Sequence, residues 1–132
     1  MPSFGMVSES VLDSVDPVMN MIVREAITMY DFSVLEGYRS PERQDMLFRD
    51  GKSKLPGGKS KHNVFPSIAV DLAPFPIDWN DLDRFVFLAG VMHASAHAIG
   101  FGDQLRWGGD WDMDHQLTDE RFRDLGHFEL VV

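Results

Sequence analysis

The pattern of apolar positions along the chain predicts about three helices. A capping side chain followed by proline occurs twice, and after each pair the apolar or mixed residues recur at helical spacing. A third apolar-periodic run follows a proline-rich connector. We therefore expect helices that begin at Pro17, at Pro41 and after Asn80 or Asp81, the last two ending at about Arg49 and near Gly100.

Three short apolar segments predict strands between these helices, at residues 32–38, 67–73 and 127–132. The region 105–126 contains many acidic residues and predicts an irregular segment with one short helical turn at most. Helix and strand therefore alternate along the chain. This order predicts an α+β fold, one small domain over residues 1–132 with a mainly antiparallel sheet.

Composition narrows the classes of protein to which the chain can belong. Its 132 residues are 44% hydrophobic and 25% charged, as expected for one globular domain, and we expect a monomer. A net charge of −9 argues against nucleic-acid binding. The sequence shows neither a signal-type N-terminus nor an apolar run of spanning length, so we expect synthesis in a cytoplasm without stable membrane association. Because there is no cysteine, a transition metal would need histidine and carboxylate ligands.

Two of the predicted strands each place a metal-ligand side chain on the face turned away from the core. In residues 67–73, Asp71 lies opposite the apolar set, and in residues 127–132, His127 does the same. If these strands pair, His62 from the preceding turn can join them. Two imidazoles, a carboxylate and one open position are typical of a catalytic zinc site. A histidine ahead of a strand is also commonly a surface or hydrogen-bonded residue, so spacing alone leaves both interpretations open.

A second histidine pair lies in the third predicted helix. His93 and His97 are four residues apart and share a helix face, the spacing of H-E-x-x-H metalloproteases. Ala94 stands where the glutamate base of that motif would be. A packing role on a partly polar helix face is therefore the favoured interpretation of this pair.

Several segments together resemble one enzyme family. These are "SKH" with "AVD", "DLGHFEL", "FSVLEGYRSPERQ", "IDWND" and "LRWGGDW", which extend over nearly the whole chain. They resemble the zinc D-alanyl-D-alanine carboxypeptidases and L-alanyl-D-glutamate endopeptidases, and most closely the single-domain phage endolysins (VanY-like peptidases). The resemblance implies a hedgehog/D-Ala-D-Ala-peptidase-like fold.

The resemblance also implies a zinc ion bound by His62, Asp71 and His127. The spacer between the first two ligands is two residues longer than in the common pattern of the family. It contains Pro66 and no glycine. We therefore expect the chain to bulge beside His62.

Catalytic and substrate-binding roles follow from the same resemblance. Asp124 is implied as the catalytic carboxylate, and Arg39 as the residue that contacts the substrate carbonyl or its oxyanion. Ser60 and Gln44 match positions near the substrate. The loop before His62 carries four lysines and is expected to attract substrate carboxylates, or to be simply a solvated loop.

The implied activity is cleavage of the L-Ala–D-Glu bond in the peptidoglycan stem peptide by zinc-activated water. Two alternatives are a D-Ala-D-Ala carboxypeptidase on the same scaffold and a non-catalytic domain that binds muropeptide or metal. The presence of both Asp124 and Arg39 argues against the last. We expect the protein to be made in the host cytoplasm and to reach the cell wall through a holin-type lesion.

The acidic segment after the third helix predicts a second cation site. Asp110, Asp112 and Asp114 alternate along the chain, and like charges so placed repel one another unless a cation joins them. Alternating oxygen ligands are how calcium-binding loops begin. We expect a regulatory calcium site separate from the zinc; the alternative is an acidic surface loop without an ion.

Overall fold

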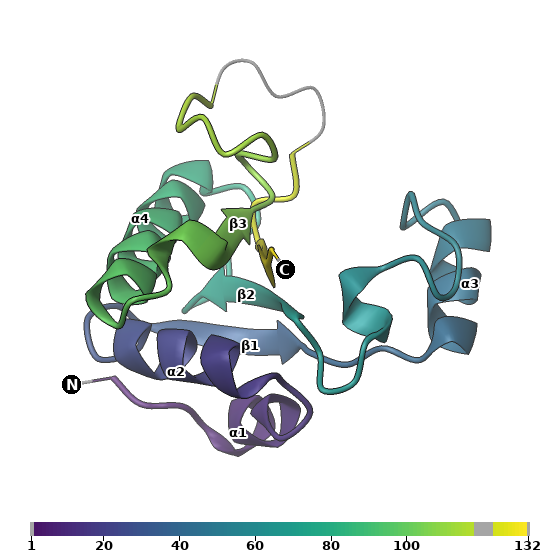
Figure 1. Ribbon diagram of the computed structural model, residues 1–132, viewed down its shortest axis with the longest axis horizontal. Helices are drawn as coiled ribbons and strands as arrows, with labels where there is room; N and C mark the ends of the chain where they lie inside the picture. The colour runs from purple at the N-terminus through teal and green to yellow at the C-terminus, as the bar shows by residue number, and fades with distance from the viewer. Residues whose placement is uncertain (1, 118–122, 132) are drawn as a thin grey trace.

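The structure, a computed structural model, describes residues 2–117 and 123–131. Within these ranges the chain forms an α+β arrangement (Figure 1). The α-helices are α1 (Met6–Leu12), α2 (Pro17–Ala26), α3 (Pro41–Arg49) and α4 (Leu82–Ala98). The strands are β1 (Phe32–Glu36), β2 (Ala69–Pro74), β3 (Leu105–Trp107) and β4 (His127–Leu130), and two short 3₁₀ helices are η1 (Lys61–Asn63) and η2 (Gly102–Gln104).

The four strands form one antiparallel sheet in the order β1-β2-β4-β3. The pairing of β2 with β4 is the one predicted from sequence. Its register places Val70 opposite Phe128 and Asp71 opposite His127. Because side chains alternate along a strand, the first of these pairs faces one side of the sheet and the second faces the other.

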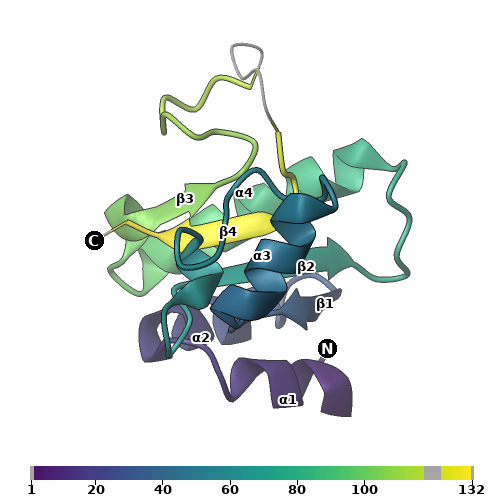
Figure 2. The same ribbon diagram turned by 90° about the vertical axis from the view of Figure 1, so that its right-hand side faces the viewer.

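The apolar core lies between the sheet and the helices α2 and α4. Figures 1 and 2 show α4 on one side of the sheet and α3 on the other. On the core side, Val70, Leu72 and Phe128 are fully buried, as are Met92 of α4 and Ile22 of α2. Asp71 and His127 therefore lie on the opposite face of the sheet, on the same side as α3 and η1.

The predicted helix starts are confirmed. The side chain of Asp16 accepts a hydrogen bond from the backbone N–H of Val18, and that of Ser40 accepts one from Arg43. Asp81 is the N-cap residue of α4, although its side chain makes no capping hydrogen bond. No helix among the described residues is long and apolar enough to cross a membrane.

One α-helix and one strand were not predicted, nor were the two 3₁₀ helices; for the α-helix and the strand there is a physical reason. Helix α1 has only seven residues and follows Gly5 without a side-chain cap, so no start signal precedes it. It is fixed by tertiary contact, since the hydroxyl of Ser8 accepts a hydrogen bond from the backbone N–H of Val34 in β1. Strand β3 has three residues and exists because it pairs with β4. The prediction of about three helices was therefore one too few, and residue 132 of the last predicted strand lies outside the described residues.

A glycine joins β3 to the segment that precedes β4. The N–H of Gly108 donates to the carbonyl of His127 at 2.8 Å, and the N–H of Asp124 donates to the carbonyl of Gly108 at 2.8 Å. A β-carbon on Gly108 would collide with the carbonyl oxygen of Asp124. The backbone at Asp124 can therefore approach this closely only because residue 108 has no side chain.

Replacement of Gly108 by alanine should destabilise the protein. The added methyl group must displace backbone rather than a flexible side chain, and overpacking of this kind costs about 1–3 kcal/mol. Gly90→Ala is the matched control: it lies in α4, and an added β-carbon there meets nothing within 4 Å. That control should be stabilised by up to about 1 kcal/mol. Urea unfolding of the wild type and both variants measures the change in unfolding free energy, which should be negative for Gly108→Ala and positive for Gly90→Ala. Equal unfolding free energies of the two variants would contradict the close approach at Gly108.

Candidate metal centre and active site

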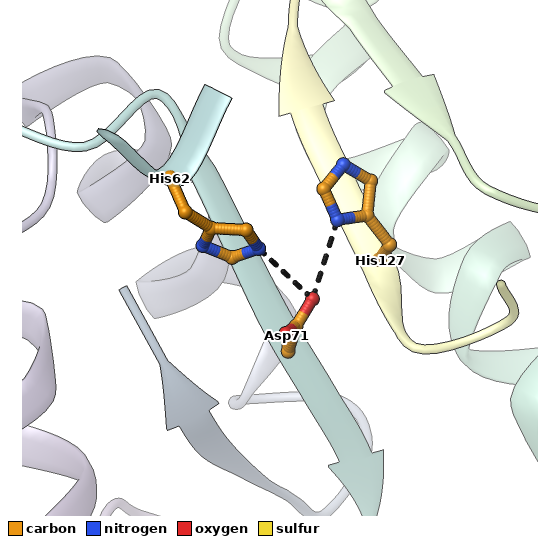
Figure 3. A group of neighbouring side chains, drawn as sticks. All are labelled: His62, Asp71 and His127. Atoms are coloured by element: carbon orange, nitrogen blue, oxygen red, sulfur yellow. Dashed lines mark hydrogen bonds and ion pairs between the residues drawn. The ribbon is translucent and has the colours of Figure 1, made fainter. Parts of the chain in front are cut away.

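Three side chains predicted as metal ligands meet at one point of the sheet (Figure 3). The Oδ1 atom of Asp71 lies 3.2 Å from Nε2 of His62 and 3.3 Å from Nδ1 of His127. One ligand atom from each residue lies within 4.8 Å of the others. The structure thus brings together the full predicted set.

Local backbone structure accounts for the position of each of the three. Asp71 and His127 are directly opposite in the ladder between β2 and β4. His62 lies in η1, and the side chain of Ser60, the N-cap residue of that helix, accepts a hydrogen bond from the N–H of His62. The backbone carbonyl of His62 also accepts a hydrogen bond from Arg39 at 2.8 Å. The longer spacer after His62 is therefore accommodated without separating it from Asp71.

The outer nitrogen of each imidazole is held by an acceptor. Nδ1 of His62 lies 2.7 Å from the carbonyl oxygen of Gly37, and because a carbonyl only accepts, this nitrogen carries the proton. Nε2 of His127 donates to Oε1 of Glu129 at 2.8 Å, and Arg106 holds that carboxylate at 2.7 Å. Donation outward leaves an inward lone pair on each ring when a metal replaces the shared proton. Two imidazoles and a carboxylate arranged in this way fit zinc.

Electrostatic interactions in the site oppose the effect of burial. Burial alone would raise the pKa of Asp71, but hydrogen bonds from His127 and His62 hold it well below its usual range. Burial alone would lower the pKa of His127, but hydrogen bonds to Asp71 and Glu129 raise it to about 9. Without a metal, His127 is therefore charged at neutral pH, and a proton satisfies the carboxylates around it.

The three residues line a cleft of about 530 Å³ that also contains the predicted catalytic groups. Arg39, Asp124 and Ser60 line it, together with the side chain of Trp111. Its lining carries five basic and four acidic side chains, whereas the whole chain has a net charge of −9. The basic residues on this lining are Arg39, Arg43, Lys52, Lys54 and Lys61. The lysine-bearing loop before His62 therefore forms part of the cleft.

Arg39 is held rigidly at the base of the cleft. Its guanidinium donates to both carboxylate oxygens of Glu36, at 2.8 and 2.7 Å, and to the side-chain oxygen of Gln44 at 2.7 Å. It also lies 3.5 Å from Oδ2 of Asp71. Gln44 itself is fully buried, and its NH₂ group donates to Ser53 and Leu55. A direct substrate contact by Gln44 remains a prediction, since in this structure its amide positions Arg39.

Two backbone hydrogen bonds fix the position of Asp124. Its N–H donates to Gly108, and its carbonyl accepts a hydrogen bond from the N–H of His127 at 3.1 Å. Loss of water around the carboxyl group raises its pKa, and the negative charge of Asp71 raises it further. A carboxylate whose pKa lies above its ordinary value is a stronger base, which suits a group that must take and return a proton.

Sequence reasoning did not assign supporting roles to several residues of this site. Glu36 orients Arg39, and Arg106 orients Glu129. Trp111 lies against the ring of His127, with ring centroids 5.4 Å apart. The i, i+2 spacing of His127 and Glu129 on one strand face was visible in the sequence. The other contacts join segments far apart in sequence, and no local pattern marks them.

The acidic segment after β3 also gathers its carboxylates. Oxygen atoms of Asp110, Asp112 and Asp114 lie within 4.8 Å of one another. Asp110 is only 4% exposed; its Oδ2 accepts a hydrogen bond from the N–H of His115, whereas its Oδ1 is buried without a hydrogen-bond partner. Burial raises the pKa of this carboxyl group. Buried polar atoms normally have a hydrogen-bond partner or contact an ion, and Oδ1 of Asp110 has no hydrogen-bond partner.

The rival histidine pair on α4 does not form a metal site in the part of the chain that the structure describes. Nδ1 of His93 lies 2.9 Å from the carbonyl of Ala89, and its ring packs edge-on against His115. His97 is exposed. Neither belongs to a group of three ligand atoms close enough to hold an ion. The packing interpretation is thereby supported.

Comparisons with known proteins agree with this geometry. A family model described as phage L-alanyl-D-glutamate peptidase matches residues 2–131. The peptidoglycan L-alanyl-D-glutamate endopeptidase CwlK of Bacillus subtilis (strain 168) is 30% identical over an alignment of 118 residues, and the match covers 76% of this chain and 61% of that protein. The chain therefore spans less than two thirds of the length of that relative.

A solved structure shares the fold over almost the entire chain. The crystal structure of Serratia marcescens L-Ala D-Glu endopeptidase ChiX superposes with a TM-score of 0.76 at 27% sequence identity. The match covers 98% of this chain and 91% of that chain. It confirms the predicted α+β architecture and its resemblance to peptidases of this class. On the match of its family model, the chain belongs to the phage L-alanyl-D-glutamate peptidase family.

Proposed function

We propose that this protein is a zinc-dependent endopeptidase that cleaves the L-Ala–D-Glu bond of the peptidoglycan stem peptide. The observation that carries the proposal is the convergence of His62, Asp71 and His127 in one cleft with Asp124 and Arg39. The names of the family and of both relatives describe the same activity. Neither a surface histidine nor a packing role explains why all five groups share one cavity.

In the proposed mechanism, His62, Asp71 and His127 hold the zinc ion. When bound, zinc acts as a Lewis acid and lowers the pKa of water to about 7. Asp124 takes the proton of the attacking water and returns it to the amine of the leaving D-Glu. Arg39 offsets the negative charge that develops on the carbonyl oxygen of L-Ala. The contacts of Arg39 with Glu36 and Gln44 fix its position before substrate arrives.

Two substitutions separate metal binding from proton transfer. Asp124→Asn should fold and retain zinc, yet lose hydrolysis by roughly 10²-fold or more, the usual contribution of a general base. His127→Ala should lose zinc itself, which metal analysis of the purified protein measures. Mass spectrometry of digested peptidoglycan identifies the cut: a new D-Glu amino terminus supports the proposal. Release of terminal D-Ala would indicate the carboxypeptidase alternative, and full activity of Asp124→Asn would exclude Asp124 as the base.

As the pH rises, the stability of the metal-free protein should fall, whereas the stabilisation added by zinc should increase. The pKa of His127 in the folded protein, about 9, lies above its ordinary value of 6.5. Its charged form therefore contributes stability that is fully present below pH 6.5 and is lost as the pH rises through about 9. Zinc must displace that proton, so the apparent zinc affinity should increase over the same range.

Melting temperatures of chelator-treated and zinc-loaded protein, at pH 6.5 and pH 9 with buffered free zinc, test this expectation. The metal-free protein should melt at a lower temperature at pH 9, whereas the rise in melting temperature caused by zinc should be larger there. His97→Ala is the control, because it removes an exposed histidine and should keep both trends. A zinc effect of the same size at both pH values would contradict competition for His127.

We further propose that Asp110, Asp112 and Asp114 bind a calcium ion. The buried and unpartnered Oδ1 of Asp110 supports this, since hard oxygen ligands are those that calcium takes. The loop lies between β3 and the segment that contains Asp124, and Trp111 from the same loop packs on His127. An ion in this loop would thus stabilise one wall of the cleft.

Calcium should raise the melting temperature or the activity of the zinc-loaded protein, and Asp112→Ala should abolish that response with zinc still bound. Asp103→Ala is the control, because it also removes one exposed negative charge but lies outside the cluster. Calorimetric titration measures binding directly. If no heat of binding is seen with millimolar calcium on the zinc-loaded protein, the loop is an acidic surface segment without an ion.

A further inference from the structure

A second hollow shares Asp124 with the cleft that holds the three proposed metal ligands. It has a volume of about 400 Å³ and is lined by Trp79, Leu82, Phe85, Leu125 and Arg123. The two cavities are therefore neighbouring parts of one surface, with the proposed proton acceptor in the lining of both.

The aromatic wall of this hollow is both fixed and open to solvent. Trp79 stacks on Phe85, with ring centroids 5.5 Å apart and an angle of 21° between the rings. Phe85 is buried at 2% exposure, whereas Trp79 remains 59% exposed. The connector between β2 and α4 that carries Trp79 lies near the start of α4 (Figure 2). An indole held on one face and exposed over most of its surface is a typical element of a ligand site.

Charge is distributed unequally between the two cavities. Five basic side chains line the cleft on the metal side, beside four carboxylates. Three of these carboxylates, Glu36, Asp71 and Glu129, are already paired within the site, so the lysines of the loop before His62 can attract an acidic group of a ligand. The hollow beside Trp79 has one basic side chain, Arg123, and its other lining side chains apart from Asp124 are apolar. A substrate that spans Asp124 would therefore place an acidic part in the cleft and a neutral part against the aromatic wall.

The proposed substrate has this polarity. On one side of the scissile bond is D-Glu with its carboxylate. On the other side, L-Ala is joined through a neutral lactyl group to an amino-sugar ring. The C–H groups on one face of a pyranose ring are weakly positive and pack against the negative face of an indole. We infer that the hollow beside Trp79 is a subsite for the amino sugar that bears the stem peptide, an inference that rests on the proposed function.

Two substrates with the same scissile bond test this subsite. One is the disaccharide that carries L-Ala-D-Glu-diaminopimelate, and the other is the same tripeptide with an N-acetyl group in place of the sugar. The wild-type kcat/KM should favour the sugar-bearing substrate by roughly 2- to 10-fold, the usual contribution of an aromatic stacking contact. Trp79→Ala should bring this ratio close to one, and Trp79→Phe should retain most of it.

Phe87→Ala is the matched control, since Phe87 is also an aromatic residue with 59% exposure but does not line the hollow. This variant should keep the wild-type ratio. A wild-type ratio of one, or an unchanged ratio in Trp79→Ala, would overturn the subsite while leaving the endopeptidase activity in place. A fall in kcat/KM for both substrates by the same factor would also overturn it, since an apolar peptide side chain would then occupy the hollow.

Failure of the proposed function would be recognised separately, because neither substrate would then be cut between L-Ala and D-Glu. The subsite would in that case be decided by binding of the peptide-free disaccharide, followed through the indole N–H resonances in NMR spectra. A saturable shift of the indole resonance that Trp79→Ala removes from the spectrum, together with calorimetric binding of the disaccharide that is weakened in Trp79→Ala, supports the subsite. The absence of any shift at millimolar disaccharide would overturn it.

Discussion

The antiparallel pairing of β2 with β4 is the constraint on which the site depends. Its register sets Asp71 directly across from His127, so the backbone ladder fixes the separation of two proposed ligands before any metal binds. A slip of one residue would turn Asp71 toward the apolar core and Val70 toward the cleft. Because Val70, Leu72 and Phe128 are fully buried on the core side, that slip is strongly opposed by the packing of the whole domain.

Around this pair, further polar side chains hold Arg39 and His127 in position. Glu36 and Gln44 hold Arg39, and Glu129 with Arg106 holds His127. Most of these side chains are buried, where a charge left without its partner is costly. Removal of a supporting residue should therefore damage the site through misplacement rather than through loss of chemistry.

Much of this site could be predicted from the sequence, because its central residues lie on strands with a strict two-residue alternation. Asp71 and His127 stand out as polar residues on apolar strands, and the resemblance of the surrounding motifs adds His62, Asp124 and Arg39. The supports of Arg39 and the Trp111 contact could not be predicted in this way. They depend on how α3 and the loop after β3 fold back over the sheet, and single-sequence patterns carry no signal for such contacts.

The difference between local sequence patterns and contacts of distant segments also explains why α1 and β3 were not predicted. Helix α1 and strand β3 are short, and each is stabilised by tertiary pairing rather than by its own residues. For Gln44, the family resemblance predicts a position near the substrate, and this stays a prediction. The three-dimensional arrangement adds that its amide is turned inward and contacts Arg39 and Ser53.

The charge of the cleft lining has a consequence for how the molecule moves near its target. The chain carries a net charge of −9, yet basic side chains slightly outnumber acidic ones, five to four, in the lining of the cleft. Such a separation of charge gives the molecule an electric dipole. Near a polyanionic surface, such a dipole exerts a torque that favours orientations with the lysine-bearing loop toward that surface. Dissolved salt screens this torque within about 8–10 Å, so the preferred orientation arises only in the last few molecular layers before the surface.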